Sequence, residues 1–148
     1  MKKFFVTTPI FYVNASPHLG QAYVDVIADV LARWHRLKGD DTFFLTGTDE
    51  HGMKIVRAAE KAGVPVERFV REKREEFKNV LRIVGASPDE FIWTHDEKHH
   101  WPGVRKIWEA LHAKGDLYKA SYRGFYCVGH EAFVTEKDLV NGKCRDHK

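Results

Sequence analysis

Two clusters of polar residues in this chain have the types and spacing that chemistry requires. The first, His18-Leu19-Gly20-Gln21, leads directly into a stretch with helical periodicity. A helix N-terminus presents unpaired N–H groups and the positive end of the helix dipole, and both favour a phosphate chain. Gly20 lets a nucleotide approach the backbone, and His18 can donate a hydrogen bond to a phosphoryl oxygen. Alone, this short pattern fits an ordinary capping loop equally well.

The second cluster consists of two Cys-x-x-His segments near the end of the chain. They supply Cys127, His130, Cys144 and His147 in two pairs of equal spacing. A tetrahedral zinc ion takes four such ligands, and two turns that each supply a pair are the usual arrangement. The chain has nine histidines, so incidental spacing is the alternative, but both cysteines fall in matching pairs. Four protein ligands leave no open position, so the predicted Zn²⁺ is structural.

The elements that must position these clusters alternate between strand and helix. Apolar, β-branched and aromatic runs predict strands at 3–8, 41–46 and 91–94, and a loop rich in Pro, Asn and Ser follows the first strand. Apolar residues at helical spacing predict helices at 21–38, 53–62, 65–84 and 104–115. This alternation predicts an α/β fold, with a Rossmann-like, nucleotide-binding parallel sheet that helices cover on both faces.

The character of the chain changes after Gly115. Short turn-rich segments with several aromatic residues replace the long helical stripes. The sequence therefore predicts two parts: the first half of a Rossmann-type catalytic domain at 1–115, and the start of a small inserted zinc-binding module at 116–148.

Composition limits the classes of function. The chain has 148 residues, of which 43% are hydrophobic and 30% charged, as is typical of a globular domain. A net charge of +3 permits contact with phosphate but does not by itself indicate nucleic-acid binding. Two cysteines are too few for a disulfide framework, and no apolar run reaches the length of a membrane span. We therefore expect a cytoplasmic protein with no membrane partner.

Two longer blocks carry a resemblance to a known family. The segment PIFYVNASPHLG at 9–20 resembles the first motif of class I aminoacyl-tRNA synthetases, in particular of their methionyl branch. The segment FFLTGTDEHG at 43–52 resembles the same branch at the end of its second strand, and TEKDLV at 135–140 fits as well. The resemblance implies an enzyme that activates methionine with ATP and Mg²⁺ to methionyl-adenylate and transfers methionine to tRNA(Met).

The resemblance also implies roles at the nucleotide site. His18 would be the catalytic residue, because it would stabilise the phosphorus under attack, and Gly20 would seat the adenosine of ATP. Gln21 would bind ATP beside them, although the family usually has a second histidine at this position. Glutamine can still donate a hydrogen bond to a phosphate or ribose oxygen, but it cannot carry charge.

A methionine site is implied in the same way. Asp49 matches the carboxylate that binds the ammonium group of methionine, and Ile10 and Tyr12 match residues that line the side-chain pocket. Core packing is the alternative for Ile10, and a helix N-cap is the alternative for Asp49. Related synthetases also have a zinc knuckle near the paired cysteines, usually with cysteine where this chain has His130.

The family's second motif, a loop rich in lysine and serine, has no counterpart in these 148 residues. The chain is therefore expected to be the N-terminal catalytic part of a longer enzyme and to be inactive in aminoacylation alone. A class I synthetase for another aliphatic amino acid and an inactive truncated nucleotide-binding relative remain alternatives. A small zinc-stabilised nucleic-acid-binding module would need a denser basic stripe. A small nucleotidyltransferase would have no reason to carry Asp49-Glu50-His51-Gly52 or the paired ligands.

Overall fold

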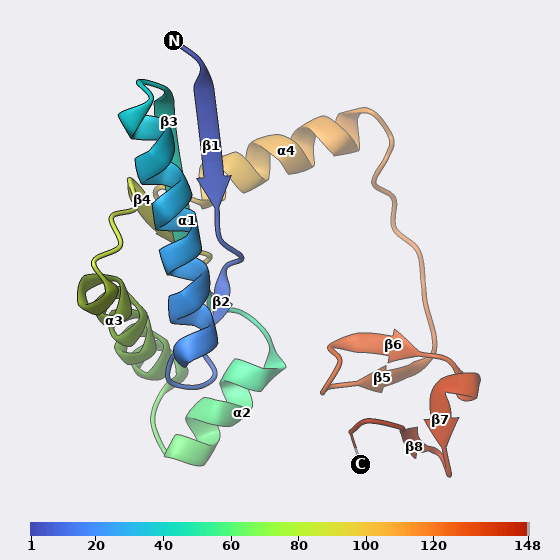
Figure 1. Cartoon of the computed structure of the whole chain (residues 1–148). Helices are drawn as coiled ribbons and strands as arrows, with labels where there is room; N and C mark the ends of the chain where they lie inside the picture. The colour runs from blue at the N-terminus through green and yellow to red at the C-terminus, as the bar shows by residue number, and fades with distance from the viewer. Residues whose placement is uncertain (148) are drawn as a thin grey trace.

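The computed structural model describes residues 1–147, which form a parallel β-sheet with helices followed by two small two-stranded sheets (Figure 1). The first part contains β1 (Lys3–Thr7), β2 (Phe11–Tyr12), α1 (Leu19–Leu37), β3 (Asp41–Asp49), α2 (Met53–Ala62), α3 (Val66–Val84), β4 (Glu90–Trp93) and α4 (Trp101–Ala113). The second contains β5 (Phe125–Cys127), β6 (Ala132–Val134), the 3-10 helix η1 (Glu136–Asp138), β7 (Leu139–Val140) and β8 (Lys143–Cys144). The predicted α/β class with a parallel sheet is confirmed.

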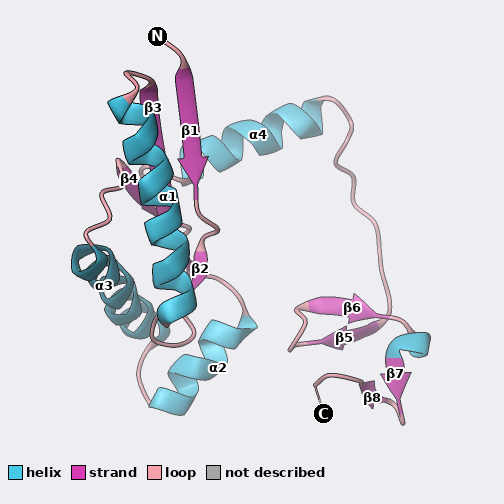
Figure 2. Cartoon of the chain, viewed as in Figure 1, coloured by secondary structure: helices cyan, strands magenta, loops and turns pink. Residues whose placement is uncertain are grey.

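Strand β3 lies at the centre of the main sheet, and each of its neighbours is parallel to it. On one edge, β1 pairs with its first half and β2 with its last two residues. On the other edge β4 pairs with it from Leu45 to Thr48. The pairing with β2 extends β3 to Asp49, three residues beyond the predicted end. The carboxyl ends of β2, β3 and β4 therefore meet at one end of the sheet. Figure 2 shows β2 at this end, above α2.

The strand β2 lies in the segment that the sequence predicted to be a loop. Its register pairs Phe11 with Thr48 and Tyr12 with Asp49. Phe11 is 8% exposed and stacks on Phe77 of α3, with ring centroids 5.7 Å apart. Burial of this ring aligns the backbone with β3, although the segment has too few residues for a periodic pattern to predict a strand.

Helices α1 and α3 pack on the same face of the sheet. Thr46 of β3 donates a hydrogen bond to Asp25 of α1 at 3.1 Å. Thr46 is in register with Phe91 of β4, which packs against the core cluster that contains Phe77 of α3. Paired residues of neighbouring strands point to the same face, so both helices cover it.

The prediction that helices cover both faces is wrong for the described residues. On the opposite face, Phe5 and Phe43 stack with ring centroids 6.0 Å apart and are 61% and 45% exposed. The strand order explains the difference, because the chain moves across the sheet in one direction, from β1 to β3 to β4. Right-handed crossovers that advance in one direction place their helices on one face.

Residues 116–124 form an extended connection without helix or strand, which leads from α4 to the β5–β6 hairpin (Figure 1). The β7–β8 hairpin follows, and Cys127 is the one buried residue among residues 116–147. Among residues 1–147, no helix combines the length and apolarity that crossing a membrane requires.

Candidate functional site

The residues predicted to bind methionine lie at the carboxyl ends of the strands. Tyr12 of β2 is in register with Asp49 of β3, so two residues that are distant in sequence become neighbours in the sheet. Ile10 and Tyr12 are 43% and 38% exposed, which contradicts the core-packing alternative for Ile10. The carboxyl edge of an open parallel sheet is where ligands bind in this class of fold.

Asp49 is held by groups from the residues that directly follow β3 and β4. The backbone N–H of His51 donates to Asp49 Oδ1 at 3.3 Å, and Thr94 Oγ1 lies 3.5 Å from the same oxygen. The N-cap of α2 is Gly52, whose φ of 116° is in the region that favours glycine. Asp49 is therefore not the cap of α2, and its second carboxylate oxygen has no hydrogen-bond partner among residues 1–147.

His18 is the N-cap of α1, and its side chain is exposed. Its Nδ1 accepts a hydrogen bond from the N–H of Gly20 at 3.1 Å. A neutral imidazole that accepts at Nδ1 carries its proton on Nε2. A Cβ at position 20 would lie 3.0 Å from the His18 ring, so the glycine also leaves space for this ring. The local fold thus presents an N–H donor beside a helix N-terminus.

Gln21 has a structural role that its sequence context does not indicate. Its Oε1 accepts a hydrogen bond from the backbone N–H of His18 at 2.8 Å, which completes a capping box at the start of α1. The pattern escapes notice because such boxes usually begin with Ser or Thr, whereas here the first residue is histidine. The amide N–H groups of Gln21 remain as donors for a ligand.

Glu131, from the second part of the chain, also reaches this site. The hydroxyl of Tyr12 donates to Glu131 Oε2 at 2.7 Å, and Lys54 Nζ lies 3.9 Å from the same oxygen and 5.7 Å from the centroid of the Tyr12 ring. The hydrogen bond to Glu131, followed by desolvation, raises the pKa of Tyr12 to about 12. No local pattern could have indicated a contact between residues 119 positions apart.

A buried ion pair supports the end of β3. Glu50 is 5% exposed and accepts two hydrogen bonds from Arg74 of α3, at 2.5 and 2.6 Å. Thr48 donates to the same carboxylate at 2.9 Å, and the guanidinium lies 4.6 Å from the centroid of the Trp93 ring. These contacts fix the backbone beside Asp49, and Glu50 itself is too enclosed to meet a ligand.

The four predicted metal ligands come together in the second part of the chain. Their ligand atoms all lie within 4.8 Å of one another. The Sγ to Nδ1 separations are 3.5 Å for Cys144 and His130, 3.7 Å for Cys127 and His147, and 3.8 Å for Cys144 and His147. Zinc bonds of about 2.3 Å to sulfur and 2.0–2.1 Å to nitrogen at tetrahedral angles require an S···N separation of about 3.6 Å. The residues present therefore fit a tetrahedral metal ion.

Groups around the cluster also fit a metal site. His130 Nε2 lies 3.3 Å from Asp146 Oδ2, which is the carboxylate partner that metal-binding histidines usually have. The backbone N–H of His130, directed at Cys127, lowers the pKa of that thiol. A Cβ at Gly129 would lie 2.2 Å from the ring of His147, so only glycine fits at this turn.

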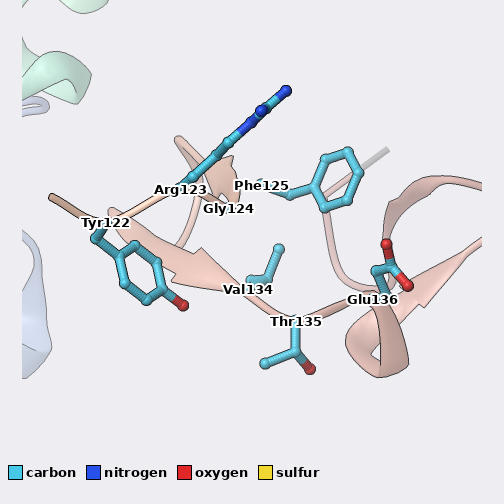
Figure 3. Close-up of a pocket in the computed structure, with 7 residues that line it drawn as sticks. All are labelled: Tyr122, Arg123, Gly124, Phe125, Val134, Thr135 and Glu136. Carbon is cyan, nitrogen blue, oxygen red and sulfur yellow. The ribbon is translucent and has the colours of Figure 1, made fainter.

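A hollow of about 530 Å³ lies elsewhere in the second part, and Figure 3 shows it with Val134 at its centre and the Arg123 side chain directed away from it. Its lining is Tyr122, Arg123, Gly124, Phe125, Val134, Thr135 and Glu136. It shares no residue with the predicted nucleotide, methionine or metal sites.

Comparisons with known proteins agree with this geometry. The family model described as tRNA synthetases class I (M) matches residues 4–148. A methionine–tRNA ligase of Clostridium acetobutylicum is 46% identical over 145 residues, which is 98% of this chain and 22% of that protein. The chain thus spans about a fifth of the length of this curated relative.

Solved structures show the same relationship. The methionyl-tRNA synthetase of Mycobacterium tuberculosis, bound by methionyl-adenylate, superposes with a TM-score of 0.88 at 42% identity, over 95% of this chain and 28% of that one. A leucyl enzyme of Agrobacterium radiobacter in complex with tRNA has a TM-score of 0.78 at 21% identity, over 99% of this chain and 19% of that one, and shows the fold alone. The chain belongs to the methionine family of class I tRNA synthetases.

Proposed function

We propose that this chain is the N-terminal catalytic part of a methionine–tRNA ligase, which joins methionine to ATP and passes it from methionyl-adenylate to tRNA(Met). The observation that carries the proposal is the register of Tyr12 with Asp49 at the carboxyl ends of β2 and β3. The similar enzyme of Mycobacterium tuberculosis was solved with methionyl-adenylate bound. Because the chain spans 22% of a curated relative, the rest of the site would come from segments outside these 148 residues.

The first step is an attack by the methionine carboxylate on the α-phosphorus of ATP, with release of pyrophosphate. Such a reaction depends on positioning and on stabilisation of charge more than on covalent catalysis. The half-buried carboxylate of Asp49, held by the His51 N–H, would bind the ammonium group common to all amino acids. The exposed side chains of Ile10 and Tyr12 would give an apolar surface and a ring for the thioether.

The nucleotide would bind along the N-terminus of α1, entering with Mg²⁺ on its phosphates. The Nε2 proton of His18 would stabilise the charge that develops on the phosphoryl group. Gly20, which is exposed, would let the adenosine lie close to the backbone. Gln21 would contribute its amide N–H while its carbonyl oxygen remains in the capping box.

Residues 116–148 would form the start of an inserted module that a Zn²⁺ ion holds together. Cys127, His130, Cys144 and His147 would be its ligands, and the ion would have no open position for chemistry. Both cysteines are free thiols, as a metal site in the reducing cytoplasm requires.

Methionine-dependent exchange of pyrophosphate into ATP, measured on the complete polypeptide, tests the proposal. We expect His18→Ala to slow exchange by about 10²–10³, the usual effect of removing one donor to a developing negative charge. His112→Ala, which removes an exposed histidine in the last turn of α4, is the matched control and should change nothing.

A second variant separates the two substrates. Asp49→Asn should raise the KM for methionine far more than the KM for ATP, because a charged partner of the ammonium group is lost. Exchange that depends on leucine or isoleucine instead of methionine would contradict the assigned substrate. Equal weakening of both substrates would contradict the assigned role of Asp49.

A further inference from the structure

Glu131 has a backbone conformation that its residue type does not favour. Its φ is 53°, and Asn141 is the other non-glycine residue among 1–147 with a positive φ. The left-handed region disfavours side chains with a Cβ, and glycine or asparagine is the usual occupant. A glutamate here indicates that its side chain does something that glycine could not do.

The side chain of Glu131 is directed toward the first part of the chain. Its carboxylate accepts a hydrogen bond from Tyr12 of β2 and lies 3.9 Å from the ammonium group of Lys54 of α2, and 16% of the side chain is exposed. The other carboxylate oxygen, Oε1, is buried without a partner in the described chain, and it lies 2.8 Å from where a Cβ at Gly52 would be. The absent side chain at Gly52 thus leaves room for this carboxylate. If Glu131 stabilised only the β5–β6 hairpin, its side chain would form its hydrogen bonds within that hairpin.

The position of Glu131 is set by the Cys/His cluster, because it directly follows the ligand His130. The turn from Cys127 to His130 is fixed by the N–H groups of Gly129 and His130 directed at the Cys127 sulfur. A metal ion in the cluster would hold this turn, and with it the backbone of Glu131, in place. Without the ion the turn has little burial to hold it, since Cys127 is the one buried residue of 116–147.

We propose that Glu131 is a positioning residue that couples the Cys/His cluster to the methionine pocket by fixing the Tyr12 hydroxyl. The inference rests on the proposed function, since it assigns Tyr12 to the methionine pocket. Its consequence is that occupancy of the metal site sets the affinity for methionine and leaves the affinity for ATP unaffected. The ion takes no part in the chemical step.

The first test is a double-mutant cycle on the complete, metal-loaded polypeptide, with methionine affinity measured by calorimetry. Glu131→Ala should raise the Kd for methionine about tenfold, as expected when a hydrogen bond to a charged acceptor is lost. Tyr12→Phe should have an effect of similar size, and the double variant should be no worse than either single one. Additive effects would overturn the proposal, because the two residues would then act independently.

Further variants at the same position separate positioning from folding. Glu131→Gln should retain most of the affinity, because an amide oxygen can still accept from Tyr12. Glu131→Gly should relieve the backbone and keep its metal, yet bind methionine as weakly as the alanine variant. Asn141→Gly, at the matched positive-φ position, should bind as the wild type does. Loss of metal from the glycine variant, or an equal rise in the KM values for methionine and ATP, would show a structural role and overturn the proposal.

Removal of the metal tests whether occupancy of the Cys/His cluster changes the affinity for methionine through Glu131. Chelation should weaken methionine binding by the wild type about tenfold and should not weaken the Glu131→Ala variant further. Equal weakening of both would overturn the coupling. Fluorine NMR of 3-fluorotyrosine-labelled protein, with the Tyr12 signal assigned from Tyr12→Phe, provides a readout without methionine. A signal that shifts on chelation and in Glu131→Ala supports the coupling even if the wild type binds no methionine, in which case the proposed function alone fails.

Discussion

The side chains of Val13, Phe44 and Ala59 are 0% exposed in the first part of the chain, whereas Cys127, at 6%, is the one buried residue among 116–147. In the first part, apolar residues of β2, β3 and the helices form the interior, and polar site residues lie at its exposed edge. In the second part the polar residues themselves are at the centre. We therefore expect the two parts to depend on different sources of stability: burial of apolar surface in the first and, as proposed above, metal ligation in the second.

The same side chain serves different purposes in the two settings. His18 uses Nδ1 to accept from a backbone N–H and presents Nε2 to solvent, so one nitrogen remains for a ligand. His130 has both nitrogens engaged, with Nδ1 at 3.5 Å from Cys144 Sγ and Nε2 at 3.3 Å from Asp146. A histidine with a free nitrogen beside a rigid core can act on a substrate, and one with both nitrogens occupied can only hold a structure.

The largest expected effect comes from Cys144→Ser. Loss of a thiolate should abolish tight metal binding, and structural zinc contributes about 10–16 kcal/mol in small zinc-dependent domains. Hydrogen exchange with mass spectrometry should then show loss of protection at residues 120–147 and unchanged protection in β3 and α1. Metal content is measured in parallel.

Lys143→Ser, which changes the neighbouring exposed residue of β8, is the control and should keep its metal. Protection of residues 120–147 in a metal-free Cys144→Ser variant would contradict the comparison, because the second part would then be stable without ligation.

Phe44→Ala should have the next largest effect, and it should destabilise the first part of the chain while leaving the second part unchanged. Phe44 is fully buried against Ala28 and Ala32 of α1, so its truncation should lower the free energy of unfolding by about 3–5 kcal/mol. Denaturant unfolding measures this loss, and metal content should stay the same. Phe43→Ala, on the open face of the same strand and 45% exposed, is the matched control and should cost less than half as much. An equal loss of unfolding free energy in the two variants would mean that side chains on both faces of β3 contribute to a hydrophobic core.

The two parts also differ in how far the sequence predicted them. Helical periodicity located α1, α2 and α3 to within two residues, because each has a continuous apolar stripe. The Cys-x-x-His spacing selected four residues whose side chains the structure brings within 4.8 Å of one another. The sequence could not show β2, because Phe11 and Tyr12 become a strand only when they pair with β3. It also could not show that Phe5 and Phe43 lie exposed on one face of the sheet within residues 1–147, because strand order is not a local property.

Within the site, residue types were easier to predict than partners. The register of Tyr12 with Asp49 follows from the pairing of β2 with β3, and no pattern in either segment encodes it. The contact of Tyr12 with Glu131 joins the two parts of the chain and depends on where the β5–β6 hairpin lies. The capping role of Gln21 was hidden because histidine took the place of the usual hydroxyl residue.

A smaller, pH-dependent effect is expected from Asp25→Asn. Burial raises the pKa of Asp25 from 3.8 to about 6, although the Thr46 hydroxyl partly offsets it. The contribution of Asp25 to the free energy of unfolding is fully present below the pKa of the unfolded state and is lost as pH rises through about 6. Removal of the charge should therefore stabilise the protein at pH 8, on the order of 1–2 kcal/mol, and much less at pH 4.5. Urea unfolding at the two pH values measures the difference.

Asp29 lies one turn later on α1, and its substitution by Asn should change the stability at pH 8 in the opposite direction. Burial alone would raise its pKa, but hydrogen bonds from Arg33 and Ser87 outweigh burial and lower it. Its contribution is present above the unfolded pKa and is lost as pH falls, so Asp29→Asn should destabilise the protein at pH 8. The same sign for both substitutions would contradict the assignment of Asp25 as a desolvated carboxylate.

The smallest effect is expected at Gln21, where the structural and ligand-binding roles of one side chain can be separated. Gln21→His introduces the residue that the family usually has but removes the acceptor for the His18 N–H, so the free energy of unfolding should fall by about 0.5–1 kcal/mol. Gln21→Glu keeps an acceptor and should preserve stability, but its negative charge should raise the KM for ATP. Thermal unfolding and pyrophosphate exchange are measured on both variants. Gln21→His should lose stability and keep or improve its affinity for ATP, whereas Gln21→Glu should keep its stability and bind ATP more weakly. Unchanged stability in Gln21→His would show that the capping box contributes nothing to α1, and an unchanged KM in Gln21→Glu would place the phosphates away from this helix N-terminus.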